Sequence, residues 1–330
     1  MRRMVLHETG KAEDRRLTAS DAATPQPGEG EVLLRVLACA VCRTDLHIVE
    51  GELATPLPRV PGHQAVGIVE AIGPGVENVR IGERVGAGWL ASTCGTCRYC
   101  SSGRENLCAS PRFTGRDVDG GYADAMVAGA RFVYPLPEKF SDDQAAPLLC
   151  AGIIGYRALK LSGVLEGGRL GLFGFGASAH LALQVANAWR CETFVFTREP
   201  EHQQLARELG AVWAGGLDGD PGVALDAAVS FAPVGTIVPL ALKRLDRGGT
   251  LAINAVHASD VPSFPYELIY WERAVRSVAN FTREDAREFL SLAGTIDLRV
   301  ETERYPLEQA NEALARLKRG DVRGAAVLVP

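Results

Sequence analysis

The sequence predicts an α/β protein with an irregular β-rich domain followed by a doubly wound parallel sheet. The 330 residues have an ordinary globular composition, with 47% apolar and 23% charged side chains, and a length that favours two domains. Up to about residue 150, glycine, proline and short apolar runs dominate. From residue 151 on, apolar strands alternate with helical periods, which indicates βαβ units and a sheet covered on both faces.

Periodicity and turn residues place the individual elements along the chain. The tail has an amphipathic helix and a final strand, and we expect it to return to the first domain. The predicted domains are therefore 1–150, 151–296 and a C-terminal segment 297–330. Strands are predicted at 31–39, 65–72, 82–86, 169–173, 193–196, 226–231, 250–255 and 324–329, and helices at 177–189, 201–209, 236–245 and 307–319.

Charge and targeting signals narrow the class of protein. The 35 Lys and Arg residues against 40 Asp and Glu give a formal charge of −5, which argues against a nucleic-acid partner. The apolar run near the N-terminus is too short for a secretory signal, and no run approaches the ~18–20 residues of a membrane helix. We therefore expect a cytoplasmic, reducing location, where clustered cysteines indicate metal binding or catalysis rather than disulfides.

One cysteine cluster predicts a metal site by its spacing alone. Its four members follow the pattern C-x2-C-x2-C-x7-C. Four thiolates within so short a segment can close a tetrahedral shell around zinc, and a closed shell is structural. Free thiols or an iron–sulfur cluster are the alternatives. The predicted ligands are Cys94, Cys97, Cys100 and Cys108.

Further motifs stand at separated positions: Cys42-Arg43-Thr44-Asp45-Leu46-His47, Pro61-Gly62-His63, Leu149-Cys150-Ala151-Gly152 and a glycine loop at 171–179. With the cysteine cluster, this ordered set resembles the zinc-dependent alcohol dehydrogenases of the medium-chain dehydrogenase/reductase superfamily, bacterial branch near the cinnamyl alcohol dehydrogenases. The likeness covers nearly the whole chain. It implies a GroES-like catalytic domain, a Rossmann domain, and reversible hydride transfer between NADP(H) or NAD(H) and a primary aliphatic or aromatic alcohol or aldehyde (EC 1.1.1.1 or 1.1.1.2).

The resemblance also implies a second, catalytic zinc held by Cys42, His63 and Cys150. Two thiolates and one imidazole leave a fourth position open for substrate. Asp45 would accept the other ring N–H of His63, because a metal-bound imidazole usually has such an acceptor. For Asp45 taken alone, a helix-capping carboxylate is the alternative. Two zinc ions per chain are thus expected.

Three more residues of these motifs have roles implied by the resemblance. The alcohol proton would pass to the Thr44 hydroxyl and then, through the nicotinamide ribose, to His47, a residue type suited to proton exchange near neutral pH. Gln64 replaces a glutamate that is common in the family. Loss of that charge predicts a zinc that is a stronger Lewis acid. The alternative is that Gln64 is a neutral packing residue.

The substrate pocket is less visible in the sequence. By resemblance, Trp89 and Leu90 line it, and their bulk favours primary alcohols; ordinary core packing is the alternative for Trp89. At two positions the chain has a different residue from the one common in the family, so the family's roles are not transferred to these positions. Ile154 stands where relatives often have Thr, and Ala325 where many have an Arg that contacts the cofactor.

The dinucleotide site follows from the glycine loop between a predicted strand and helix, which fits G-x-G-x-x-A. The helix N-terminus then faces the phosphates. Near the end of the next strand, Thr197 and Arg198 stand where NAD sites usually have an acid. A hydroxyl and a guanidinium suit a 2′-phosphate, so NADP(H) is predicted over NAD(H). Alternatively, the arginine is a surface residue or Glu199 supplies the acid. The predicted residues are Gly174, Phe175, Gly176, Ala177, Ala179, Thr197 and Arg198.

Two other functions are alternatives to the dehydrogenase. A polyol dehydrogenase would often carry glutamate in place of Cys150. A non-catalytic or redox-sensing nucleotide-binding homologue would not need both complete ligand sets. The resemblance further implies a homo-oligomer, a dimer or tetramer, and a small alcohol or aldehyde as partner.

Overall fold

The computed structural model describes residues 1–330, which form two compact units. The first contains Met1–Cys150, Asn280–Gly294 and Val300–Pro330, and the second contains Ala151–Ala279 and Thr295–Arg299.

The segment 280–294 differs from the predicted division, which assigned it to the second domain. Within the first unit, Phe281 is buried and its ring packs against Gly88. Arg283 donates from its backbone and its guanidinium to the buried Glu105, both at 3.0 Å. The sequence analysis predicts no element in this segment, and its two side chains bind it to the first unit through residues far away in the chain.

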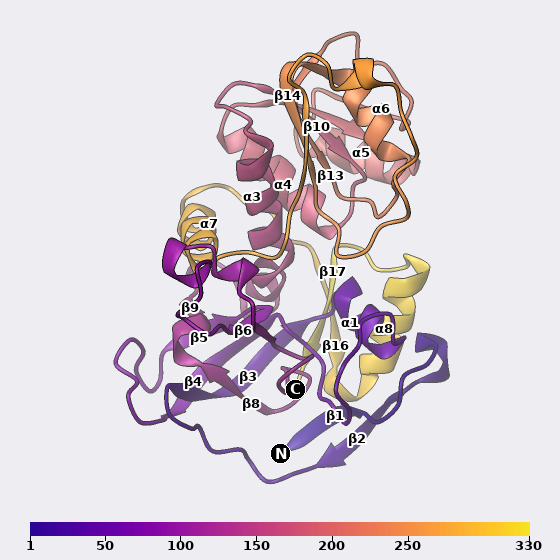
Figure 1. Cartoon of the computed structure of the whole chain (residues 1–330). Helices are drawn as coiled ribbons and strands as arrows, with labels where there is room; N and C mark the ends of the chain where they lie inside the picture. Colours follow the sequence, from indigo (N-terminus) through magenta and orange to yellow (C-terminus); the bar gives the residue numbers. More distant parts are fainter. The chain divides into compact units, whose positions relative to one another are not determined.

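The first unit is built on a seven-stranded sheet in the order β16-β17-β3-β4-β5-β9, with β8 also paired to β3 (Figure 1). The long central strand β3 (Glu31–Ala40) is mostly buried. The last strand, β17 (Ala325–Val329), pairs antiparallel with it at Leu328 and Cys39. The tail therefore completes the sheet of the first unit, because β17 buries its apolar side chains there.

The other elements of the first unit surround this sheet. Its further strands are β1 (Arg2–Leu6), β2 (Leu17–Asp21), β4 (Ala65–Ile72), β5 (Arg84–Ala87), β6 (Leu90–Ser92), β7 (Arg112–Phe113), β8 (Ala125–Gly129), β9 (Val133–Pro135) and β16 (Thr302–Pro306). Its helices are α1 (Arg43–Val49), α2 (Asp142–Ala145), α7 (Arg283–Thr295, whose last residue belongs to the second unit) and α8 (Ala310–Arg319), with short 3-10 turns at η1 (Ala12–Asp14), η2 (Cys100–Ser102), η3 (Glu105–Leu107), η4 (Ala130–Phe132), η5 (Ala146–Leu149) and η7 (Leu307–Gln309).

The second unit is a six-stranded sheet in the order β12-β11-β10-β13-β14-β15, parallel throughout. Numbered from β10, this order is 3-2-1-4-5-6, which is the order of doubly wound dinucleotide-binding sheets. The predicted α/β class is thus confirmed. Its elements are α3 (Ala151–Ser162), β10 (Arg169–Phe173), α4 (Ala177–Ala188), β11 (Glu192–Phe196), α5 (Pro200–Glu208), β12 (Trp213–Gly215), β13 (Leu225–Ser230), α6 (Ile237–Arg244), β14 (Leu245–Ile253), η6 (Tyr266–Leu268) and β15 (Ala274–Ser277).

Each predicted element has a counterpart, and the differences lie at element ends. The predicted helix 307–319 opens as the 3-10 turn η7 and becomes α-helical at Ala310. The strand predicted at 250–255 starts earlier, at Leu245. None of the helices combines the length and the hydropathy that a membrane crossing needs.

Candidate active site

The site begins at the N-terminus of α1. Cys42 is the N-cap residue, and the Asp45 carboxylate accepts its backbone N–H at 2.9 Å, which completes a capping box. This local arrangement follows from the Cys-x-x-Asp spacing. It fixes the Cys42 sulfur at the start of a helix whose next two turns carry Thr44 and His47.

The same carboxylate orients His63. Oδ1 of Asp45 accepts Nδ1–H of His63 at 3.0 Å and the Gly62 N–H at 3.2 Å, and both side chains of the pair are fully buried. Asp45 therefore both caps the helix and binds the imidazole, so the two interpretations of this residue are compatible. The other ring nitrogen, Nε2 of His63, is buried and has no hydrogen-bond partner. A buried nitrogen lone pair without a donor is what a metal ligand requires.

Two thiols complete the set around that nitrogen. The ligand atoms of Cys42, His63 and Cys150 all lie within 4.8 Å of one another. A hydrogen bond from Cys150 holds the pKa of Cys42 well below its usual value and raises that of Cys150. Burial by itself lowers the pKa of His63, but Asp45 and Cys42 raise it to about 10. The site thus favours positive charge, and its two sulfurs and one imidazole fit a zinc ion with an open position.

Thr44 and His47 lie on the same helix at different depths. Thr44 is buried, and its hydroxyl accepts a weak bond from the Cys42 thiol at 3.7 Å. His47 lies one turn later and is partly exposed, and Nδ1 of its ring contacts the Glu52 carboxylate. The helix therefore places one exchangeable hydroxyl beside the ligands and one imidazole at the solvent boundary.

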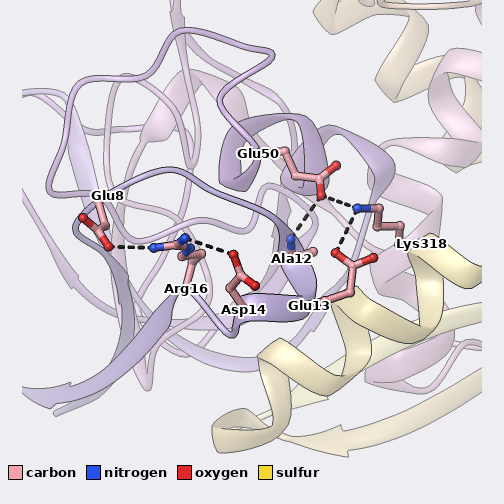
Figure 2. A network of polar contacts seen from close by, with 7 residues as sticks. All are labelled: Glu8, Ala12, Glu13, Asp14, Arg16, Glu50 and Lys318. Carbon is pink, nitrogen blue, oxygen red and sulfur yellow. Dashed lines mark hydrogen bonds and ion pairs between the residues drawn. The ribbon is translucent and has the colours of Figure 1, made fainter.

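The far end of this helix is held by ion pairs (Figure 2). Glu50, the C-cap of α1, accepts from Nζ of Lys318 at 2.6 Å and from the Ala12 N–H at 3.1 Å. Lys318 belongs to α8 and also binds Glu13 at 2.9 Å. The C-terminal helix therefore anchors the segment that carries the site residues.

Gln64 is buried next to His63, and its amide donates to the Ala40 carbonyl at 3.3 Å. This bond is available to an amide and not to a carboxylate. It supports the interpretation of Gln64 as a packing and hydrogen-bonding residue, while its neutral charge is also what the Lewis-acid hypothesis requires.

Trp89 and Leu90 are placed differently. The Trp89 ring meets His63 edge-on at 5.0 Å between centroids and stacks on Phe113 at 4.9 Å. Leu90 is buried, and it lines a separate cavity of ≈ 530 Å³ in the first unit, which none of the three predicted catalytic ligands lines. Trp89 thus lies beside one of the predicted ligands, His63, whereas Leu90 lines this other cavity.

The four-cysteine cluster has the geometry of a closed zinc site. Four of the six sulfur pairs lie 3.5–4.0 Å apart, and all four sulfurs lie within 4.8 Å of one another. A tetrahedron with Zn–S bonds of about 2.3 Å requires about 3.8 Å between sulfurs. Backbone N–H groups of Cys100 and Ala109 lower the pKa of Cys97 to about 6, which favours the thiolate form that binds metal.

The glycine loop lies between β10 and α4. Gly174 has φ +84°, a conformation that side chains disfavour, and an added Cβ would stand 3.0 Å from Ala232. Gly176 has no neighbour within 4 Å of such a Cβ, so its backbone is open to approach. Phe175 and Ala179 are buried, while Ala177 begins the helix. The loop sits where β11 and β13 flank β10 on either side, the switch point at which such sheets bind dinucleotides.

Thr197 and Arg198 follow β11 and both contact Glu199. The Thr197 hydroxyl donates to its carboxylate at 3.0 Å, and Arg198 pairs with it at 3.6 Å. Although partial burial raises the pKa of Glu199, its own backbone N–H, Thr197 and Arg198 lower it, so the group is ionised. An acid therefore lies at the end of the second strand beside the two residues predicted to bind phosphate.

Tyr122 is a site residue that the sequence analysis missed. Its ring is fully buried, and its hydroxyl donates to Oδ2 of Asp45 at 3.2 Å. The pair Gly120-Gly121 brings this segment against Gly62, whose carbonyl oxygen lies 2.0 Å from where a Cβ of Gly120 would stand. Two adjacent glycines before a tyrosine were the available signal.

Comparisons with known proteins agree with this site. The alcohol dehydrogenase GroES-like domain matches residues 28–138. The protein named probable alcohol dehydrogenase AdhA of Mycobacterium tuberculosis is 49% identical over 312 residues, 92% of this chain and 90% of that protein. An alcohol dehydrogenase of Geobacillus stearothermophilus is 36% identical and covers 99% of this chain and 98% of its own.

A solved cinnamyl alcohol dehydrogenase of Sorghum bicolor superposes with a TM-score of 0.90 at 27% identity, covering 99% of this chain and 97% of its own. The predicted GroES-like and Rossmann organisation and the predicted family are thereby confirmed. The alcohol dehydrogenase activity predicted from the motifs is confirmed at the level of NAD(P)-dependent zinc enzymes. The chain belongs to the zinc-containing alcohol dehydrogenases of the medium-chain dehydrogenase/reductase superfamily.

Proposed function

We propose that this dehydrogenase interconverts primary aliphatic or aromatic alcohols and their aldehydes at the site formed by Cys42, His63 and Cys150. The observation that carries the proposal is the partnerless, buried Nε2 of His63 beside two thiols. A ring that Asp45 holds on one side presents a lone pair on the other, and a metal held by these three residues would keep a fourth position open for a substrate oxygen. The apolar Trp89 beside His63 favours carbon-rich substrates over polyols.

When bound, zinc supplies a Lewis acid for the substrate oxygen and NAD(P) carries the hydride. The chain supplies the rest. Asp45 fixes the Nδ1–H form of His63. Thr44, buried beside Cys42, holds the hydroxyl proton that the substrate exchanges, and His47 exchanges a proton with solvent.

For the dinucleotide, we propose NADP(H) over NAD(H), bound at the glycine loop with the 2′-phosphate at Thr197 and Arg198. The Arg198–Glu199 pair is largely exposed, and such pairs are worth about 0–1 kcal/mol, so a phosphate can compete for the guanidinium. Solved relatives include one with NADP(H) and one with NAD. The ratio of kcat/KM for the two cofactors tests this: Arg198→Ala should lower the NADP(H) value and spare the NAD(H) value, and Glu199→Gln should do the reverse. A wild-type ratio near one contradicts the preference.

We further propose that the protein is a homo-oligomer of cytoplasmic location. The edge strand β15 is exposed along its whole length and leaves a row of backbone groups unpaired. Exposed apolar side chains accompany it, among them Tyr266, Trp271 and Val275. Sedimentation of wild type and Val275→Lys tests whether this edge pairs two copies. The reducing compartment is supported by the six thiols of the two predicted metal sites, which must stay reduced to bind metal.

The decisive experiment measures zinc content and turnover on the same preparations of wild type and variants. Wild type should hold two zinc ions per chain and reduce benzaldehyde and related aldehydes with NADPH. Cys42→Ala should hold one zinc ion and lose turnover, whereas an exposed control, Glu77→Gln, should match wild type. Wild type that holds two zinc ions without turning over any of a panel of alcohols and aldehydes would support the non-catalytic homologue instead.

A further inference from the structure

The cavity that Leu90 lines has no part in the proposed function. Its volume is ≈ 530 Å³, which lies within the range of about 300–1,000 Å³ that small-molecule sites have. All of its lining residues fall between 1 and 132, so the cavity belongs to the first unit alone. No residue of the proposed catalytic or dinucleotide machinery lines it.

Part of the lining is apolar and deeply buried. Val60, Leu90 and Met126 are each at most 3% exposed, and Phe132 is also buried. Val60 and Met126 belong to the hydrophobic core of the first unit. Because core packing fixes these side chains, this part of the cavity is preformed and suits a hydrocarbon chain or ring.

Three arginines line the same cavity, and none of them pairs with a carboxylate. Nε of Arg3 donates to the Ser20 hydroxyl at 3.2 Å, and Arg112 donates to the Asp117 carbonyl at 3.3 Å. Arg131 has no hydrogen-bond or ion-pair partner. Each guanidinium carries five N–H donors, so all three keep donors for an anion.

Two of these arginines lie next to strand β6. In the antiparallel pair β6–β7, Arg112 is directly opposite Ser92, so both side chains lie on one face. Arg131 comes two residues after Gly129, where an added Cβ would stand 2.9 Å from the Ala91 carbonyl of β6. Both guanidinium groups are thus carried by segments that contact the strand with the Ser92 hydroxyl, which also lines the cavity.

Thr114 is an independent indication of a polar ligand. It lines the cavity two residues after Arg112, is only 3% exposed, and its hydroxyl makes no hydrogen bond. Its backbone N–H, in contrast, donates to the Trp89 carbonyl at 2.9 Å. Buried polar side chains are nearly always hydrogen-bonded. The Thr114 hydroxyl therefore offers a donor to a polar group inside the cavity.

Carboxylates on the lining limit the charge that the ligand can carry. Asp119 binds Arg59 at 2.9 Å, and Glu31 accepts the Gly28 N–H at 2.9 Å. Glu29 is exposed and has no partner. Three acids against three arginines leave little net charge, so a polyanion is disfavoured and a singly charged anion is favoured.

We propose that this cavity is a second ligand site of the enzyme and binds a monocarboxylate with an apolar chain or ring. Arg112, Arg131 and the Thr114 hydroxyl hold the carboxylate, because guanidinium groups bind carboxylates through paired N–H donors. The apolar part lies against Leu90 and Met126. The site is distinct from the one formed by Cys42, His63 and Cys150, and it does not depend on the proposed function.

Octanoate is the probe, and acetate is the control that keeps the carboxylate but lacks the chain. Calorimetric titration of the zinc-loaded protein should show octanoate binding, with acetate at least about 100-fold weaker because little apolar surface is buried. Protein that binds no octanoate, or that binds acetate equally well, overturns the proposal.

Arginine variants test the polar half of the site. Arg112→Ala and Arg131→Ala should each weaken octanoate binding about tenfold, since each removes a charged hydrogen bond. Both side chains belong to exposed residues, so neither change should affect folding. Arg80→Ala, an exposed arginine of the same unit outside the cavity, is the matched control. Unchanged affinity in both cavity variants contradicts the assignment.

Methyl NMR of methionine locates the bound octanoate, since the chain has only three methionines. Met126 lines the cavity, whereas Met4 is buried outside its lining. With resonances assigned through Met126→Leu and Met4→Leu, octanoate should shift Met126 and leave Met4 in place. Cys42→Ala should bind octanoate as wild type does. Loss of binding in Cys42→Ala, with Met126 unmoved in wild type, would place octanoate at the catalytic metal and refute the second site. These measurements need no turnover, so they decide the proposal even if the proposed function fails.

Discussion

Replacing Asp45 by Asn tests the arrangement on which the catalytic metal site depends. The carboxylate accepts four hydrogen bonds: Cys42 N–H and Tyr122 O–H on Oδ2, and Gly62 N–H and His63 Nδ1–H on Oδ1. Asparagine has one acceptor oxygen, so its NH2 group must face two of these donors. The site is fully buried, and water cannot replace the lost acceptor.

The magnitude follows from this count. If the amide oxygen faces His63, the Tyr122 hydroxyl can rotate and become an acceptor, but the Cys42 N–H stays unsatisfied. The unsatisfied, buried Cys42 N–H, together with the weaker hydrogen bonds to an uncharged amide, should lower the free energy of unfolding by about 2–4 kcal/mol. Loss of the acceptor charge behind a metal-bound imidazole lowers metal affinity by about 10–100-fold.

The assay is competition for zinc with a chelator, read as zinc ions per chain. Asp45→Asn should release one of two zinc ions at a chelator concentration about 10–100-fold lower than wild type requires. Asp143→Asn serves as the control, since Asp143 is buried in the same unit and binds Thr302 at 2.8 Å, away from the ligands. If Asp45→Asn keeps both ions as tightly as wild type does, Asp45 does not support the metal site.

Three further changes have defined outcomes. Gly62→Ala should lower the free energy of unfolding by about 2–5 kcal/mol and weaken zinc binding, because φ is +96° and the new Cβ would stand 2.4 Å from the Tyr122 ring. Calorimetry measures the loss of stability, and metal analysis measures the zinc content. Gln64→Glu should move the pH–rate profile of alcohol oxidation to higher pH, since the added charge weakens the Lewis acid; an unmoved profile, or one at lower pH, contradicts this. Arg283→Met should lower the free energy of unfolding by about 2–3 kcal/mol near pH 7, because the buried Glu105 carboxylate loses the guanidinium that pairs with it. Burial raises the pKa of Glu105, but Arg283 lowers it, and the net effect is a pKa below the usual value of 4.5. The stability that the pair contributes is therefore present above pH 4.5 and is lost as the pH falls further. Denaturation at several pH values should show the free energies of unfolding of wild type and variant converging in acid.

The two metal sites show where sequence reasoning reached its limit. The four cysteines lie within one short loop, so their spacing alone predicts that they meet, and the four sulfurs lie within 4.8 Å of one another. The other three ligands come from the start of α1, from the turn before β4 and from the end of η5. Only the resemblance to a family brought them together in the sequence analysis, because loops far apart in the chain meet only after the sheet has formed.

The sequence by itself determined what depends on neighbours along the chain: the positions of the strands and helices that were predicted, the Cys-x-x-Asp capping box, the four-cysteine loop and the glycine turn after β10. Tertiary structure decided what depends on distant segments. It brought Tyr122 to Asp45, bound Arg283 to Glu105, and joined 280–294 to the first unit. The reason is physical: periodicity and capping act over a few residues, whereas a buried hydrogen bond or ion pair selects its partner by proximity in the folded chain.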